Sequence, residues 1–290
     1  MSHGGKHGGN GGGGHGGGGG GHGGASGGAK SSGASGVTVT GLRQSPIDIT
    51  NQFKGGLYDY PYSSARASGS QSLPLSFQGA YANGPGGRLT GGEVFNNGHT
   101  VEYTLLTTES ATVTGGALPQ GQVYRLNSFH LHFGSQDWYG SEHTVDGQAY
   151  PVEMHFVHFN QKYDTFSYAA TKPDGLAVIA VFVKLGEANP EYDQLQYDTL
   201  VKNGATRNIS TIFLNNLLPR VRNYYFYSGS LTTPPYSENV TWMVMQHPIE
   251  ISTSQMWGLR RLVRSNGTPM ENNYRPTQPL NGRVVQFFLD

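Results

Sequence analysis

Glycine is distributed unevenly along this chain, and its distribution separates a tail from a folded domain. Residues 1–36 hold 20 of the 44 glycines, no acidic residue and almost no apolar side chain, and their histidines are His3, His7, His15 and His22. Such a segment cannot bury a core, so the sequence predicts disorder there. Residues 37–290 hold an ordinary share of glycine and are long enough for one large domain. We therefore expect a Gly/His-rich tail at 1–36 and one folded domain at 37–290.

The composition of the domain excludes several classes of protein. The glycines lack the three-residue period of collagen. Residues 37–290 carry 17 Lys and Arg against 19 Asp and Glu, so the domain is nearly neutral and nucleic-acid binding is not expected. The longest apolar run, Leu176–Val183, has eight residues and is too short to span a membrane.

The chain contains no cysteine, and no apolar leader follows Met1. There is therefore no disulfide, no thiolate zinc site and no cysteine nucleophile. These two features favour the cytoplasm, with an extracellular matrix as the alternative location. The oligomeric state does not follow from the sequence.

Runs of β-branched and aromatic residues predict that most of the domain is strand, because clusters of Gly, Pro, Asn and Asp separate them. Strands are expected at 101–105, 128–133, 152–159, 177–183 and 240–245. Two helices are expected, at Pro190–Lys202 after an Asn189 cap and at Gln255–Val263 after a Ser254 cap. The pattern predicts a mainly β, α+β domain in which a sheet carries a few surface helices.

Four histidines in two of these strands suggest a metal site. His130 and His132 are two residues apart, so their side chains leave the same face of a strand. His155 and His158 are three apart and face opposite sides, so only one of them can join the pair. Three histidines with an open fourth position form the arrangement of a catalytic zinc site. The alternative is that this His-x-His motif only decorates a strand.

Nine short segments form a more specific pattern than the histidines alone. They are Gln44–Ile49, Asn96–His99, Ser128–Ser135, Gly140–Asp146, Glu153–His158, Gly175–Val178, Ser230–Pro235, Val240–Trp242 and Asn272–Leu280. In their order and spacing over about residues 42–285, they resemble the α-class carbonic anhydrases. The resemblance implies a large, twisted, mostly antiparallel sheet. It also implies an enzyme, a carbonate dehydratase, for the reversible hydration of CO2 to bicarbonate and a proton.

The resemblance also implies the residues of the reaction. His130, His132 and His155 match the family's ligands of one Zn²⁺ ion, whose bound water has its pKa lowered to about 7. The zinc-bound hydroxide then attacks CO2. Thr232 and Glu142 match the pair that orients this hydroxide, because Thr232 accepts its hydrogen bond and donates its own to the ionised carboxylate.

Further residues match the family's supporting groups. Glu153 is expected to hold His155 in one tautomer, the peptide oxygen of Asn273 is expected to do the same for another ligand, and Ser128 stands where many members bond the first ligand. His99 matches the proton shuttle, since histidine titrates near neutral pH. The apolar wall that receives CO2 is implied at Val157, Val178, Leu231, Val240 and Trp242, with Thr233 beside them.

Other functions remain open at this point. One alternative is a mineral- or metal-binding matrix protein with a weakly active carbonic anhydrase domain, in which the tail binds divalent metals weakly. The tail could equally be an inert linker, or its histidines could accept protons from His99. Esterase activity is expected only as a side reaction of the same site. The expected partners are CO2 and bicarbonate, without nucleic acid or a membrane span.

Overall fold

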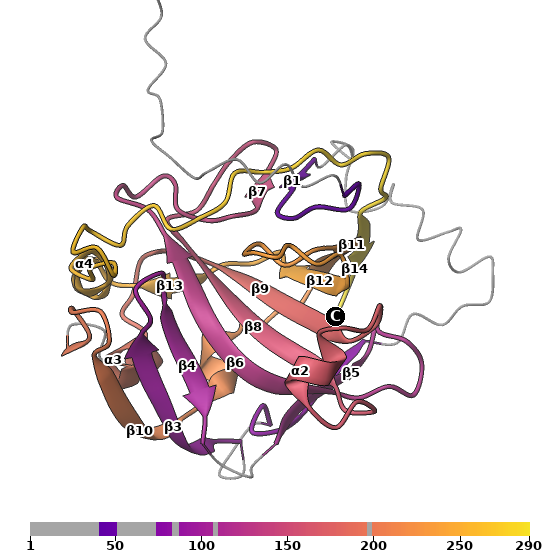
Figure 1. Cartoon of the computed structure of the whole chain (residues 1–290), viewed down its shortest axis with the longest axis horizontal. Coiled ribbons are helices and arrows are strands. Elements are labelled where there is room, and N and C mark those ends of the chain that lie inside the picture. Colours follow the sequence, from indigo (N-terminus) through magenta and orange to yellow (C-terminus); the bar gives the residue numbers. More distant parts are fainter. Residues whose placement is uncertain (1–40, 51–73, 83–86, 107–109, 196–198) are drawn as a thin grey trace, which may run out of the picture. The chain divides into compact units, whose positions relative to one another are not determined.

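A twelve-stranded, mostly antiparallel sheet forms the centre of the domain in a computed structural model of the chain (Figure 1). The structure describes residues 41–50, 74–82, 87–106, 110–195 and 199–290. All of them belong to one unit, Val39–Asp290. The tail at 1–36 lies outside the described residues. The predicted mainly β fold, with a large and mostly antiparallel sheet, is confirmed.

Nine strands follow one another across the sheet. In spatial order they are β10 (Thr206–Ile212), β3 (Leu89–Asn96), β4 (Val101–Leu105), β6 (Tyr124–Phe133), β8 (Val152–Asn160), β9 (Leu176–Leu185), β12 (Val240–Met245), β11 (Tyr224–Gly229) and β14 (Gln286–Phe288). Three more join from the side: β13 (Ile249–Ile251) pairs with β9, and β2 (Leu75–Gly79) pairs with β5 (Ala111–Gly115), which pairs with β6. Strands β12 and β13 run parallel to β9. A separate parallel pair consists of β1 (Asp48–Ile49) and β7 (Thr144–Val145).

Two apolar clusters cover the two faces of the sheet. They explain why apolar side chains alternate with histidines along β6. Phe129, Leu131 and Phe133 belong to the larger cluster. Side chains alternate between the faces of a strand, so His130 and His132 leave the opposite face. There a second cluster includes Val178 of β9 and Trp242 of β12. The histidine pair therefore lies beside an apolar surface rather than in the larger core.

A β-bulge in β6 sets the register of the histidines. Leu126 lies opposite His158 of β8, whereas Ser128 lies opposite Val157, so Asn127 is an extra residue in β6. Beyond the bulge, His130 lies directly opposite His155. Without the extra residue every later pairing would shift by one position, and His130 would no longer face His155.

Outside the sheet, the described residues form three α-helices and one 3₁₀ turn. They are α2 (Phe166–Ala169), α3 (Pro190–Leu195), η2 (Leu214–Leu217) and α4 (Thr253–Arg260). The prediction of one helix over 190–202 is wrong, because α3 ends at Leu195; residues 196–198 lie outside the described residues. The carbonyls of Leu200 and Val201 accept hydrogen bonds from Asn96 Nδ2 at 3.0 and 3.3 Å. Their positions are set by this buried side chain rather than by a continuing helix.

Helix α4 begins two residues before its predicted start and has a different cap. Ser252 Oγ accepts a hydrogen bond from the backbone N–H of Gln255 at 3.2 Å, and Gln255 Oε1 accepts one from the N–H of Ser252 at 3.0 Å. This reciprocal capping box fixes the start of the helix at Thr253. The prediction of Ser254 as the cap is wrong.

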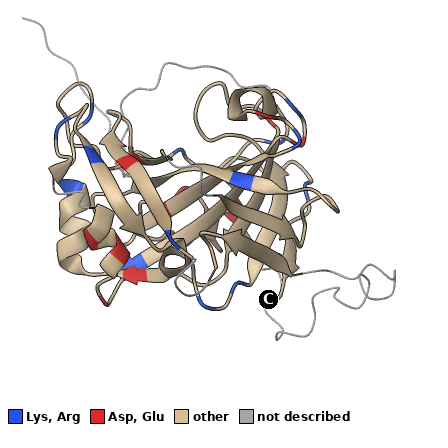
Figure 2. Cartoon of the chain, turned by 90° about the horizontal axis from the view of Figure 1, so that it is seen from below, with Lys and Arg blue, Asp and Glu red and all other residues tan. Residues whose placement is uncertain are grey.

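Charged residues of both signs are interspersed over the described part of the domain (Figure 2). This arrangement follows from the near balance of acidic and basic residues in the sequence. Among the residues that the structure describes, no helix is both long enough and apolar enough to cross a membrane.

Candidate metal centre

Three histidines converge from two neighbouring strands. His130 and His132 extend from β6 and His155 from β8, and a nitrogen of each lies within 4.8 Å of a nitrogen of the other two. The ring centroids are 5.1 Å apart for His130 and His132, 5.2 Å for His130 and His155, and 4.7 Å for His132 and His155. His132 and His155 are buried, and His130 is half-buried. The three rings can therefore direct nitrogen donors to one metal ion.

Hydrogen bonds fix the ring protons of two of these histidines on the far side of the rings. His132 Nδ1 lies 2.9 Å from the carbonyl oxygen of Asn273. A carbonyl only accepts, so Nδ1 carries the proton and Nε2 presents a lone pair. That Nε2 is buried and has no hydrogen-bond partner. An unpaired buried nitrogen of this kind is what a metal ligand requires.

A hydrogen bond also fixes the ring proton of His155. Its Nε2 lies 2.7 Å from Glu153 Oε1, so this carboxylate accepts the ring proton and leaves Nδ1 free for the triad. The pKa of His130 lies well below its usual range, mainly because burial disfavours the charged ring. The neighbouring His132 and His155 lower it further. Burial likewise lowers the pKa of His132. His130 and His132 are therefore neutral imidazoles, the form that binds a metal.

Glu153 is fully buried and accepts four hydrogen bonds. Oε1 accepts from His155 and from His143 Nδ1 at 2.6 Å, and Oε2 accepts from the backbone N–H groups of Glu142 and His143 at 2.8 Å each. Burial alone would raise the pKa of Glu153, but the two histidines and their hydrogen bonds hold it well below its usual range. Hydrogen bonding thus explains why a second group of potential metal ligands lies close together, namely His143, Glu153 and His155.

A buried chain of hydrogen bonds continues from Glu153 to the far strands. His143 Nε2 lies 2.7 Å from the hydroxyl of Tyr227 on β11, and this hydroxyl donates to Ser45 Oγ at 2.8 Å. Ser45 Oγ also accepts from the backbone N–H of Ser230 at 3.0 Å. His143 is therefore a bonded structural histidine that orients Glu153.

His158 does not belong to the triad. It is fully buried, its Nδ1 donates to the carbonyl of Phe156 at 2.9 Å, and its Nε2 lies 2.9 Å from the hydroxyl of Tyr81. Burial lowers the pKa of His158 to about 4. Of the two candidates that the sequence left open on this strand, His155 therefore faces the His130–His132 pair.

Asn273 connects the triad to the turn that carries His99. Its carbonyl accepts from His132, its Oδ1 accepts from the N–H of Phe133 at 2.8 Å, and its Nδ2 donates to the carbonyls of His99 at 3.1 Å and Leu131 at 3.0 Å. The His99 side chain is exposed. One asparagine thus fixes both a triad ring and the backbone beneath His99.

Glu142 lies beside the triad and is held by the main chain. Its Oε1 accepts from the N–H of Arg275 at 2.8 Å and lies 3.4 Å from His132 Nδ1. Its Oε2 is buried and has no hydrogen-bond partner. Thr232 is also buried, but the structure records no hydrogen bond between it and Glu142. One carboxylate oxygen thus remains available as an acceptor.

The residues expected to form an apolar wall gather on the triad side of the sheet. Val157, Val178, Val240 and Trp242 belong to one buried cluster, and Leu231 packs against it. The Trp242 ring lies 4.9 Å from the His155 ring, and its Nε1 donates to the carbonyl of Ser230 at 3.0 Å. These side chains therefore present an apolar surface next to a triad histidine.

Thr233 and Ser128 do not make the contacts that the family resemblance implied for them. Thr233 is exposed. Ser128 is buried, but its recorded hydrogen bond comes from Asn127 Nδ2 at 3.4 Å, and it makes no direct bond to His130. The sequence also gave no sign of the roles of Arg275 and Tyr227, because their partners are far away in the chain.

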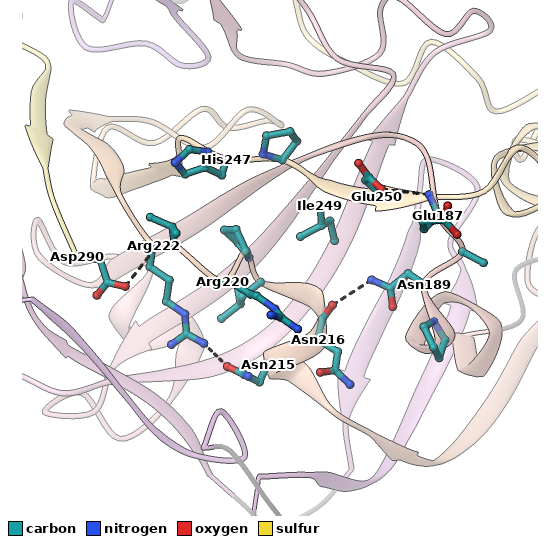
Figure 3. Close-up of a pocket in the computed structure, with 16 residues that line it drawn as sticks. Glu187, Asn189, Asn215, Asn216, Arg220, Arg222, His247, Ile249, Glu250 and Asp290 are labelled. Carbon is teal, nitrogen blue, oxygen red and sulfur yellow. Dashed lines mark hydrogen bonds between the residues drawn. The ribbon is translucent and has the colours of Figure 1, made fainter. Parts of the chain in front are cut away.

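A groove of about 1250 Å³ lies away from the triad (Figure 3). It is lined by both acidic and basic side chains, including Glu187, Arg220, Arg222, His247 and Glu250, and by none of the triad residues. Glu250 is paired with Lys184 Nζ at 3.0 Å and accepts from the N–H of Glu187 at 3.1 Å. The groove offers no comparable convergence of unpaired donors, so the candidate site is the triad.

A large, mostly antiparallel sheet with three convergent histidines defines a protein with a candidate catalytic metal centre. The model of the eukaryotic-type carbonic anhydrase family matches residues 32–288. Carbonic anhydrase 7 of Homo sapiens is 40% identical over 254 residues, which cover 85% of this chain and 88% of that protein. Carbonic anhydrase 7 of Mus musculus is 44% identical over 201 residues, or 67% of this chain and 75% of that protein. Carbonic anhydrase 3 of Homo sapiens is 42% identical over 201 residues, or 67% and 76%.

The chain belongs to the eukaryotic-type carbonic anhydrase family. The resemblance inferred from its motifs and the predicted enzyme class, a carbonate dehydratase, are confirmed by these matches.

Proposed function

We propose that this chain catalyses the reversible hydration of CO2 to bicarbonate and a proton with one zinc ion held by His130, His132 and His155. The observation that carries the proposal is the buried, unpaired Nε2 of His132 among three convergent histidines. Three nitrogen ligands leave a fourth position open, which is typical of catalytic rather than structural zinc. When bound, zinc supplies a Lewis acid that lowers the pKa of its water to about 7.

The residues around the triad support this chemistry. Glu153 and the Asn273 carbonyl hold the proton-bearing nitrogens of His155 and His132, so the opposite nitrogens remain free for the metal. Glu142 is a carboxylate whose Oε2 is available to accept a hydrogen bond from Thr232. A carboxylate can only accept, so it would direct the Thr232 hydroxyl and leave the threonine oxygen to accept from the reacting group.

Different residues would bind the substrate and remove the proton. CO2 carries no charge, so the apolar surface of Val157, Val178, Val240 and Trp242, with Leu231 packed against it, suits it. Thr233 lies next to Thr232 at its edge. His99 is exposed on a turn fixed by Asn273, and an exposed histidine can take up the released proton and pass it to buffer.

The proposal is tested by replacing His132 with Ala in the full chain and measuring zinc content and CO2 hydration together. We expect one zinc per wild-type chain, with hydration above the buffer rate, and loss of both in His132→Ala. Lys172→Ala, a change at a half-buried residue outside the site, serves as the control. Wild-type hydration without bound zinc would refute the zinc assignment, and bound zinc without hydration would refute the activity.

A further inference from the structure

The loop at 231–237 carries Thr232 and contains a strained residue. Tyr236 has φ 60°, in the left-handed region, where a bulky residue is an outlier. Such a conformation persists only where surrounding contacts hold it, and it occurs preferentially at functional sites. The N–H of Leu231 donates to the carbonyl of Ser237 at 3.0 Å and closes the loop. The contacts of Tyr236 therefore bear on the position of Thr232.

The ring of Tyr236 is stacked against a guanidinium group. Arg275 Cζ lies 4.0 Å from the ring centroid. The Tyr236 carbonyl accepts a hydrogen bond from Gln44 Nε2 at 3.2 Å. The strained residue is thus held at its ring by one segment and at its backbone by another, both far from it in sequence.

Arg275 connects this loop to the segment that holds Glu142. Its backbone N–H donates to Glu142 Oε1 at 2.8 Å. Its Nη1 donates to Gln44 Oε1 at 2.9 Å and to the Ser45 carbonyl at 2.6 Å. These acceptors fix the plane of the guanidinium, so its face is presented to the Tyr236 ring. One residue therefore contacts Glu142 through its main chain and the Thr232 loop through its side chain.

We propose that Tyr236 is a positioning residue, whose stacking on Arg275 holds Thr232 at the correct distance from Glu142. This inference rests on the proposed function, because it concerns the Thr232–Glu142 pair. A partly exposed cation–π contact is worth about a twofold to fivefold change in an equilibrium, equivalent to roughly 0.5–1 kcal/mol. Loss of the ring should therefore open the loop and weaken catalysis by a similar factor.

The substitution Tyr236→Asn removes the ring and introduces a residue that tolerates a left-handed backbone, so a looser loop could not result from added strain. Tyr236→Phe keeps the ring and its stacking. Tyr168→Asn is the matched control, because Lys172 Nζ lies 4.1 Å from the Tyr168 ring in a comparable contact on α2. Arg275→Lys also removes the stacking contact, because lysine lacks the planar guanidinium. It keeps the backbone N–H that donates to Glu142.

The measurements are amide hydrogen exchange of 231–237 and kcat/KM for CO2 hydration, both on the full chain. We expect Tyr236→Asn and Arg275→Lys to speed exchange at the Leu231 amide by about twofold to fivefold and to lower kcat/KM by a similar factor. Tyr236→Phe should keep wild-type exchange, and Tyr168→Asn should change neither quantity.

Unchanged exchange at Leu231 in a folded Tyr236→Asn or Arg275→Lys variant would overturn the proposal. Faster exchange with unchanged kcat/KM would also overturn it, because the ring would then have only a structural role. A wild-type chain that does not hydrate CO2 would instead refute the proposed function, and the exchange result would still report whether the ring holds the loop.

Discussion

Replacing Glu153 with Gln tests whether hydrogen bonding prepares His155 for a metal. Two of the four donors to Glu153 are backbone N–H groups, which cannot become acceptors. The amide oxygen of the new side chain must therefore face them, and its NH2 group must face the rings of His143 and His155. His155 Nε2 would then accept a hydrogen bond instead of donating one.

This exchange moves the proton of His155 to the wrong nitrogen. With Nε2 as acceptor, the neutral ring carries its proton on Nδ1, the nitrogen that faces the triad. A protonated nitrogen cannot bind a metal. Loss of an outer hydrogen bond of this kind costs about 10- to 100-fold in metal affinity. Changing a buried acceptor to a donor also costs about 1–3 kcal/mol in the free energy of unfolding.

The assay is a competition titration of zinc against a chelator of known affinity, with thermal unfolding of the metal-free and zinc-loaded forms. Glu250→Gln is the matched control, because it makes the same change in a partly exposed carboxylate paired with Lys184. We expect the zinc dissociation constant to rise for Glu153→Gln and to stay unchanged for Glu250→Gln. A Glu153→Gln variant that binds zinc as tightly as wild type would refute the tautomer argument.

Two further predictions concern histidines with opposite environments. His99→Ala should lower maximal turnover in weak buffer, because the exposed imidazole no longer accepts protons, and added imidazole should restore part of it; equal turnover in stopped-flow assays would exclude the role. The pKa of His158 is about 4 in the folded state, against an ordinary value of 6.5 in the unfolded state. The unfolded chain therefore binds this proton first, and the free energy of unfolding should fall by up to about 3 kcal/mol as pH drops from 6.5 to 4. His158→Gln should lose this part of the slope in urea titrations of the metal-free protein at several pH values; an identical slope would contradict the assignment.

The sequence predicted that His130 and His132 share one face of the sheet, but not the register that places them beside His155. The two-residue spacing of His130 and His132 places them on one face, since side chains alternate along any strand. The choice between His155 and His158 depends on the extra residue Asn127 in β6. A bulge of this kind leaves no local sign in the sequence, so spacing alone kept both histidines open.

Long-range contacts explain what else the sequence did not predict. The helix expected over 190–202 does not include residues 200 and 201, whose carbonyls accept hydrogen bonds from Asn96 on a strand about a hundred positions earlier. Arg275 likewise contacts Glu142 and Tyr236, which are remote in the chain. Residue types and periodicity describe local structure, whereas these contacts depend on the completed fold.

Stopped-flow CO2 hydration by the full chain, with zinc removed and then restored, tests whether a bound zinc ion is required for the reaction. We expect a rate well above buffer for the chain with one zinc bound, its loss when a chelator removes the metal, and its return on addition of one equivalent of zinc. A hydration rate that survives complete removal of zinc, or a fully zinc-loaded chain with no rate above buffer, would contradict this expectation.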